Sequence, residues 1–468
     1  MKHTRLLASF FIASLQGYLF SHPLLIENIQ VLGSTIIVRP NEEFKKKYLN
    51  NDFFVTYENE VDLSQFDYSI LSIPFLMNVV SIVWISQEMY YVEQMDTELY
   101  HSLNRVKKVF QVMYPNTDWS GEIVPLTLVD HSLPFVKDEN KIASLFSGGV
   151  DSVASFLQHS SNQQLLITAW GHWDLPLSNQ GIWHERFQKI NEFATACSQE
   201  TSKIRSNYTA MLNYKYLSSL TREIPKWRLG AVEGIGWAGL TAPLLLSKGY
   251  ATLAIASSHC WNYPYPSAAS PFIDHNLRYC GLSVRHTQFE LSRLQKIKYI
   301  CKHFEAIGDT RPFLKVCSYE KDIDENCLRC RKCLTTALCF YALGYDPNPY
   351  GLESALEQTQ KIFSRIYALF NKDELNFYSI QLGKEIQQTI RHRKEKGHHT
   401  SLYLEKFLTI NFDEKRAFDT ESQIALDWST MIALLPPDHD LYIPLPYLPS
   451  PADDAPVLDD NSHDFILL

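Results

Sequence analysis

Residues 147–152 read Ser-Gly-Gly-Val-Asp-Ser and lie between an apolar run and a segment with helical spacing. The run at 142–146 predicts a short strand, and the segment from 152 to about 159 predicts a helix. Two adjacent glycines let the backbone turn sharply and approach a ligand closely, because neither carries a Cβ atom. The free amides at a helix N-terminus favour an anion. The loop therefore predicts a phosphate-binding turn.

The loop offers several groups for such a site. Its amides come from Gly148, Gly149 and Val150, while Ser147 and Ser152 offer hydroxyl donors. Asp151 can cap the helix or help to hold Mg²⁺ near the phosphates, and we take Asp151 and Ser152 as candidate catalytic residues. The loop has neither the Gly-Lys-Ser/Thr of a Walker A motif nor the spacing G-x-G-x-x-G. The alternative is a plain strand-to-helix turn with a Ser or Asp cap.

Strands and helices alternate along the chain from Lys141 onward. Residues 165–170 and 251–257 predict strands, and residues 183–198 and 230–247 predict helices. Such alternation favours an α/β fold with a doubly wound parallel sheet. Apolar residues make up 45% of the chain, which is enough for a large core and excludes global disorder.

The pattern divides the 468 residues into four predicted units. Residues 1–138 predict an N-terminal α+β module of unknown role, and residues 139–345 predict the nucleotide-binding domain. Residues 346–430 predict a helical extension. Residues 431–468 hold seven Asp, seven Pro and no Lys, Arg or Glu, so we expect a disordered acidic tail there.

Four cysteines, Cys317, Cys327, Cys330 and Cys333, have the spacing C-x9-C-x2-C-x2-C. Gaps of two residues let a turn fold several thiolates around one ion, and four thiolates make a closed, structural zinc site. The alternative is four buried core cysteines, since free cysteine is often buried. A thiolate cluster in a long chain indicates a reducing compartment, so we expect a cytoplasmic protein.

The loop and the cysteines together resemble the PP-loop (N-type) ATP pyrophosphatases. Within that superfamily, a PP-loop followed by four cysteines of nearly this spacing is similar to the 7-cyano-7-deazaguanine synthases. The resemblance covers residues 141 to about 344, which is under half of the chain. Two departures are a slightly longer first cysteine gap and Leu328, where a Gly commonly follows the second cysteine. The long N-terminal module is a third.

This resemblance implies an enzyme that uses ATP, Mg²⁺ and Zn²⁺ and acts on a small molecule. It would transfer AMP to a carboxylate or carbonyl oxygen, release pyrophosphate, and let ammonia or another nucleophile displace the AMP. A sulfur-transfer enzyme of the same superfamily that acts on tRNA is a rival hypothesis. A second rival is a non-catalytic nucleotide-binding module, with the N-terminal module or the tail recruiting a protein partner.

Three other segments are candidates for ligand contacts. Asp174 follows one predicted strand and can contact a ribose or an adenine amine, or it can cap a turn. His259 follows another strand, either as a general base or as a structural histidine. Tyr263 lies in an aromatic, Pro-rich loop that can form a stacking wall or simply a rigid turn. Lys296 and Lys298 are typical of a solvated helix face.

Charge and the N-terminus bear on partners and on location. The net charge is −9, and removing the seven tail aspartates leaves −2, so the body lacks the basic footprint of a general nucleic-acid binder. The apolar run at 6–20 resembles a signal peptide, but Gln16 interrupts it and no small-x-small cleavage site follows. A buried first element or an over-long start are the alternatives. The run is short for a membrane span, and nothing in the sequence indicates an oligomeric state.

Overall fold

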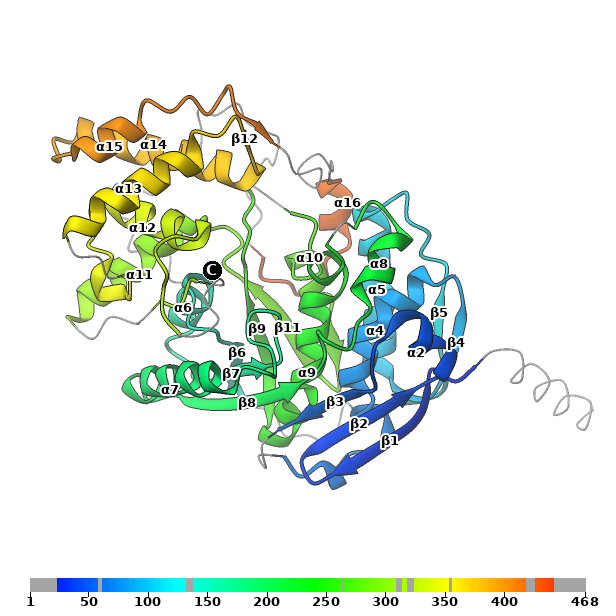
Figure 1. Ribbon diagram of the computed structural model, residues 1–468. Coiled ribbons are helices and arrows are strands. Elements are labelled where there is room, and N and C mark those ends of the chain that lie inside the picture. The colour runs from blue at the N-terminus through cyan, green and yellow to red at the C-terminus, as the bar shows by residue number, and fades with distance from the viewer. Residues whose placement is uncertain are drawn as a thin grey trace, which may run out of the picture.

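The computed structural model describes residues 23–57, 61–131, 138–224, 226–262, 265–308, 314–317, 324–352, 356–417 and 426–441 (Figure 1). The run that resembles a signal peptide, Tyr263 and the tail beyond residue 441 lie outside these residues.

A nine-stranded sheet runs through the described residues. Its order is β1 (Ile26–Leu32), β2 (Thr35–Pro40), β3 (Phe53–Thr56), β8 (Glu200–Ser206), β7 (Gln163–Trp170), β6 (Asp138–Leu145), β9 (Tyr250–Ala256), β11 (Leu282–Thr287) and β10 (Arg278–Tyr279). The five strands from β8 to β11 are mutually parallel. The predicted mixed α/β class with a largely parallel sheet is therefore confirmed.

Helices cover both faces of the parallel strands. Leu166 of β7 belongs to the hydrophobic core that contains α6 (Val150–Gln158) and α11 (Arg293–Ile307). Its neighbours Leu165 and Ile167 belong to the other core, with α9 (Glu233–Lys248) and α4 (Ile73–Ile85). Successive residues of a strand point to opposite faces, which explains this division. Parallel strands buried on both faces carry continuous apolar runs, as β7 does from Leu165 to Ile167.

The N-terminal part shares its core with the parallel sheet. β3 pairs antiparallel with β8, through Val55 with Ser206 and Thr56 with Arg205. All residues of α4 are buried, and that helix packs on α9. The predicted boundary at 138 therefore does not separate two cores. The physical reason is that β8 and α9 would otherwise leave an unpaired strand edge and an apolar helix face in water.

Around this shared core lie the remaining N-terminal elements and a few short segments of the sheet connections. They are α2 (Glu42–Tyr48), η1 (Leu63–Gln65), α3 (Tyr68–Leu71), β4 (Met89–Asp96), α5 (Thr97–Met113), β5 (Glu122–Val129), α8 (Tyr214–Leu220), the π-helical turn η2 (Arg228–Val232) and α10 (Pro271–Asp274). The longer helix α7 (Gln180–Ala196) packs instead in the core of α6 and α11, through Ile190 and Ala194. Among the described residues, one helical stretch, 228–248, is long and apolar enough to cross a membrane, and 89% of its apolar window is buried inside the protein.

The helical extension forms a second lobe, seen at the upper left of Figure 1. It contains η3 (Asn348–Tyr350), α13 (Leu356–Phe370), β12 (Glu374–Leu375), α14 (Phe377–Glu395), α15 (Leu402–Phe407) and β13 (Arg416–Ala417), and it packs on α12 (Arg331–Leu343) of the preceding unit. Its apolar residues join the core beneath α6 and α11. The extension is therefore continuous with the face of the sheet that carries the glycine loop.

The segment from α16 (Trp428–Ala433) to residue 441 packs on the body. Met431 is buried, Arg278 contacts Asp438 at 2.6 Å, and Arg285 pairs with Asp440. Where a disordered tail was expected from residue 431, its first eleven residues are therefore docked. Pairing with these arginines offsets the acidic charge that made the segment look disordered.

Candidate functional site

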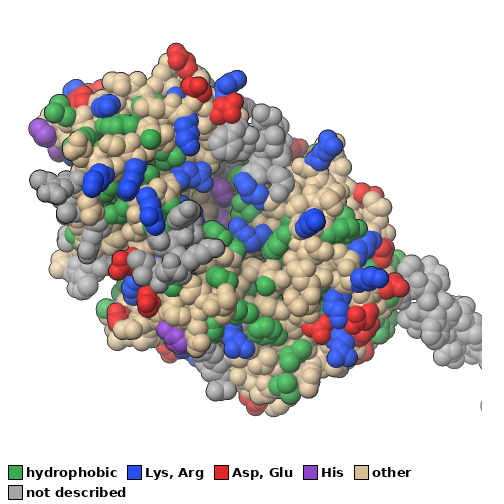
Figure 2. Space-filling model, viewed as in Figure 1, with side chains coloured by type: hydrophobic (Ala, Val, Ile, Leu, Met, Phe, Trp, Pro, Cys, Tyr) green, Lys and Arg blue, Asp and Glu red, His purple; other side chains and the backbone are tan. Residues whose placement is uncertain are grey.

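The glycine loop leaves the carboxyl end of β6, which lies between β7 and β9. The connection after β6 runs through α6 on one face of the sheet, and the connection into β9 runs through α9 on the other. Connections that leave to opposite faces open a crevice outside the strand ends, where α/β proteins bind ligands. Figure 2 shows a hollow between the helical lobe and the rest of the molecule, with Lys, Arg and His side chains around it.

The loop has the backbone geometry that its glycines allow. Gly148 has a φ of 73°, in the left-handed region that favours glycine, and Gly149 is the N-cap of α6. No described side chain caps this helix, so its first amides are left for another acceptor. The hydroxyls of Ser147 and Ser152 lie 3.4 Å apart beside the turn. The predicted hydroxyl donors and helix amides are therefore adjacent.

Asp151 lies in the first turn of α6 between two cations. Its carboxylate contacts Arg293 Nη2 at 3.0 Å and Lys296 Nζ at 3.3 Å. Burial by itself would raise the pKa of Asp151, but Arg293 and Lys296 outweigh it and hold the pKa below the ordinary value. The carboxylate is therefore ionised at neutral pH, as a ligand for Mg²⁺ must be.

Lys296 does not lie on the solvated helix face that its sequence suggested. Its side chain is 2% exposed, and Nζ donates to the carbonyl of Ser257 at 2.5 Å as well as to Asp151. A buried ammonium requires such partners, because an unpaired charge in the interior is costly. Lys296 therefore joins the carboxyl end of β9 to the start of α6.

The loop after β7 carries the second candidate, Asp174. His172 Nδ1 lies 2.5 Å from Asp174, and its Nε2 lies 3.5 Å from Glu233. Burial lowers the pKa of His172, but its bonds to Asp174 and Glu233 outweigh it and raise the pKa above the ordinary value. Burial alone would raise the pKa of Asp174, yet His172 and then Arg186 hold it well below its usual range. Asp174 therefore belongs to an ion-pair chain at the mouth of the crevice.

His259 follows β9, where the sequence placed it. Its ring stacks on Tyr265 at a centroid distance of 5.0 Å and is partly buried. Burial lowers the pKa of His259 to about 4. The ring is therefore neutral near pH 7, and a group with so low a pKa is a weak general base at that pH.

This low pKa gives a stability prediction. The unfolded chain, with a pKa of 6.5 for this histidine, binds the proton more readily than the folded protein does at pH values between 6.5 and about 4. The contribution of the neutral His259 ring to the free energy of unfolding is therefore complete above pH 6.5. It is lost as the pH falls, by about 2 kcal/mol at pH 5. In urea unfolding at pH 7 and pH 5, we expect His259→Gln to lose about 2 kcal/mol less than the wild type. Equal losses in both proteins would contradict this.

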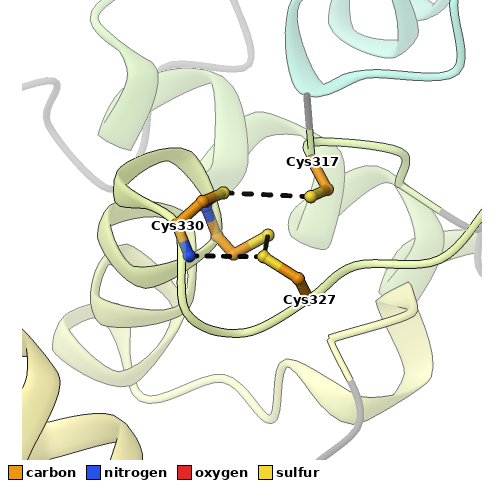
Figure 3. Close-up of side chains that lie close together, drawn as sticks. Cys317, Cys327 and Cys330 are labelled. Carbon is orange, nitrogen blue, oxygen red and sulfur yellow. Dashed lines mark hydrogen bonds between the residues drawn. The ribbon is translucent and has the colours of Figure 1, made fainter. Parts of the chain in front are cut away.

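The structure confirms that the four cysteines lie together. Their sulfur atoms all lie within 4.8 Å of one another. The sulfurs of Cys317 and Cys330 lie 3.9 Å apart (Figure 3), and those of Cys327 and Cys333 are also 3.9 Å apart. Zinc–sulfur bonds of about 2.3 Å in a tetrahedron place the sulfurs about 3.8 Å apart. The cluster therefore fits a metal ion such as zinc.

Leu328 shows what the local turn requires. It lies between two of the cysteines and has a φ of 49°, in the region that glycine adopts without cost. Cys330 then caps α12, with its amide donating to the sulfur of Cys327 at 3.3 Å. The turn that gathers the thiols thus needs a left-handed residue at the position where the resemblance predicted a Gly.

The cysteine cluster borders the crevice directly. Lys315, two residues before Cys317, donates its amide hydrogen to the carbonyl of Gly148 at 2.8 Å. Lys332, between two of the cysteines, lies over the ring of Trp173 at 5.8 Å. Burial lowers the pKa of Lys332, and the nearby Arg293 lowers it further. The cluster therefore supports the glycine loop on one side and presents a lysine toward the loop after β7 on the other.

Several site residues were missed by sequence reasoning because each is an isolated charged residue in an ordinary helix or loop. They are Arg186, Glu233, Arg293, Lys315 and Asp324. The fold and the site define a mixed α/β protein with an uncapped glycine turn at the sheet crevice and a cysteine cluster fit for a metal. No protein-family model matches the sequence, and no curated protein matches it significantly. The particular function must therefore be argued from the chemistry of this site.

Proposed function

We propose that this protein is an ATP-dependent enzyme of the PP-loop kind that forms AMP and pyrophosphate, with a reaction like that of the 7-cyano-7-deazaguanine synthases. The observation that carries the proposal is the uncapped N-terminus of α6, preceded by Gly148 and Gly149, at the crevice of a parallel sheet. Amides at that position are suited to the phosphates of ATP. Arg293 and Lys296 supply positive charge beside them.

The proposed reaction begins with attack on the α-phosphorus. An oxygen of the substrate carboxylate forms a bond to that phosphorus, the bond to the β-phosphate oxygen breaks, and pyrophosphate leaves. Ammonia or another nucleophile then attacks the activated carbonyl carbon and displaces AMP. The protein would contribute positioning and charge stabilisation, which are the main terms in phosphoryl and nucleotidyl transfer. Mg²⁺, held through Asp151, would neutralise charge on the phosphates.

The cysteine cluster would have a structural role. Four thiolates around one zinc ion leave no open coordination position for substrate or water. Its contacts to Gly148 through Lys315 give it a function in holding the loop. We therefore assign no chemical step to it.

The sulfur-transfer rival needs a reactive thiol outside the cluster. Of the five other cysteines, all in the described residues, four are buried, and burial raises the pKa of Cys280 and Cys339 far above the ordinary value. Cys197 is half-buried. Reactive thiols have lowered pKa values in electropositive surroundings, so these features favour the carboxylate-activating hypothesis.

An ATP–pyrophosphate exchange assay distinguishes the proposed enzyme from a non-catalytic nucleotide-binding module. We expect labelled pyrophosphate to exchange into ATP in the presence of the right carboxylate, with 7-carboxy-7-deazaguanine the first candidate and no tRNA added. Asp151→Asn should reduce exchange at least about tenfold, because it removes the carboxylate that would hold Mg²⁺ beside the phosphates. Asp373→Asn, an exposed aspartate on the helical lobe, is the matched control. No exchange with any carboxylate would favour a non-catalytic module.

A further inference from the structure

Helix α14 of the helical lobe (Figure 1) shares a hydrophobic core with the helix that follows the glycine loop. Its buried residues Ile386 and Ile390 belong to the same core as Val153 of α6. Near the C-terminal end of α14, Arg393 lies so close to Gly344, the C-cap of α12, that its guanidinium would overlap a Cβ atom placed there. Apolar packing and this contact therefore hold α14 against the body of the protein.

Two polar side chains of α14 contact the start of α11. Ser292 is the N-cap of α11, and its hydroxyl donates to Glu385 Oε1 at 2.5 Å. Arg293 is the first residue of α11, and its Nε donates to the hydroxyl of Tyr378 at 3.1 Å. Two successive residues at the beginning of α11 are thus bonded to side chains that lie 93 and 85 residues further along the chain.

Arg293 extends this contact to the glycine loop. Its Nη2 lies 3.0 Å from the carboxylate of Asp151, in the first turn of α6. The two side chains are 15% and 20% exposed, so the pair borders solvent at the crevice. Within the residues that the structure describes, Nη1 of Arg293 donates to no protein group. Its two N–H groups are therefore available to a ligand on the loop.

The contacts on both sides restrict the orientation of the Arg293 guanidinium before any ligand binds. A free arginine side chain has many rotamers, and binding an anion must restrict them at a cost in affinity. With Nε on Tyr378 and Nη2 on Asp151, much of this restriction is already present. A planar guanidinium in a fixed orientation suits phosphate oxygens, which it binds through parallel hydrogen bonds. The Tyr378 hydroxyl therefore contributes orientation and adds no charge.

We propose that Tyr378 is a positioning residue, through which the helical lobe holds Arg293 in the orientation that binds the phosphates of ATP. This inference rests on the proposed function, because it takes the glycine loop to bind ATP. Glu385 supports the same arrangement by holding the N-cap of α11 through Ser292. The lobe lies beyond the residues that resemble the PP-loop enzymes, and the proposal makes it part of the ATP site.

Calorimetric titration with ATP and Mg²⁺ in a double-mutant cycle tests the inference. Tyr378→Phe keeps the ring and removes only the hydroxyl, so we expect about fivefold weaker binding with little change in melting temperature. Arg293→Gln should weaken binding about tenfold or more. Added to Arg293→Gln, Tyr378→Phe should have no further effect, because no guanidinium is left to hold. Tyr367→Phe, which removes a hydroxyl bonded to the carbonyl of Tyr403 in the same lobe, is the matched control.

The outcomes separate this inference from the proposed function. If the wild type binds ATP and Tyr378→Phe binds it equally well, the inference is overturned and the proposed function stands; this comparison does not require that Arg293→Gln folds. If Tyr378→Phe weakens binding equally with and without Arg293→Gln, the hydroxyl does not act through Arg293, which also overturns the inference. If the folded wild type binds no ATP, the proposed function fails and the inference fails with it.

Discussion

Replacing Gly149 with valine is expected to weaken ATP binding at least about a hundredfold while the protein stays folded. A Cβ atom at this position would lie 3.3 Å from the carbonyl oxygen of Lys315 and 3.4 Å from Ser147 Oγ. These contacts are tight for one carbon atom, and the two further methyl groups of valine would crowd the turn and cover the first amides of α6. Losing several charge-assisted hydrogen bonds to the phosphates accounts for the size of the effect.

Calorimetry with ATP and Mg²⁺ on the purified variant measures this effect. Gly181→Val is the matched control, because nothing lies within 4 Å of a Cβ placed at that residue of α7. We expect the control to bind ATP like the wild type and both variants to keep cooperative unfolding. A folded Gly149→Val variant with wild-type affinity would show that the loop does not hold phosphates.

The second large effect concerns the metal. We expect the wild type to bind about one zinc per chain. Cys330→Ser should release that ion and lower the melting temperature by about 10 °C or more. The sulfur of Cys330 lies 3.9 Å from Cys317, and the residue also caps α12. The free energy of binding at a structural site is part of the folding free energy, which is why the loss is large. Activity should fall only as far as the folded fraction falls.

Elemental analysis and thermal unfolding check both parts of this prediction. Cys197→Ser, a half-buried cysteine outside the cluster, should keep its metal and its melting temperature. Two results would count against the account. Metal-free wild-type protein whose four thiols react readily in the native state would exclude the metal site. A stable Cys330→Ser variant that binds ATP but has no turnover would make one of these cysteines catalytic and favour the sulfur-transfer hypothesis.

The loop and the cysteine cluster were predictable because each depends on residues close together in the sequence. Gly148 and Gly149 lie at a strand-to-helix junction, and the last three cysteines of the cluster are separated by only two residues each. Both signals identify a local turn, and local turns form largely from local residue preferences. The mixed α/β class followed from the alternation of apolar runs in the same way.

The buried ion pairs of the site and the docking of residues 431–441 depend on contacts between distant segments. Asp324 meets Arg186 across 138 residues, and nothing in either local sequence marks the pairing. Lys296 looked like a surface lysine because Lys298 follows it closely in the same helix, yet it packs against the end of β9. Asp438 and Asp440 are typical of a disordered tail in the sequence, which does not show that they pair with Arg278 and Arg285. Periodicity reports the burial of apolar faces and does not reveal which buried charges meet.

We propose that the protein cleaves ATP between the α- and β-phosphates. ATP labelled at the α-phosphate, incubated with the protein, Mg²⁺, ammonia and a carboxylate that supports pyrophosphate exchange, measures this directly. We expect the label to appear in AMP, one pyrophosphate to be released per AMP, and Gly149→Val to form neither product. Label that appears in ADP, with release of inorganic phosphate, would contradict it.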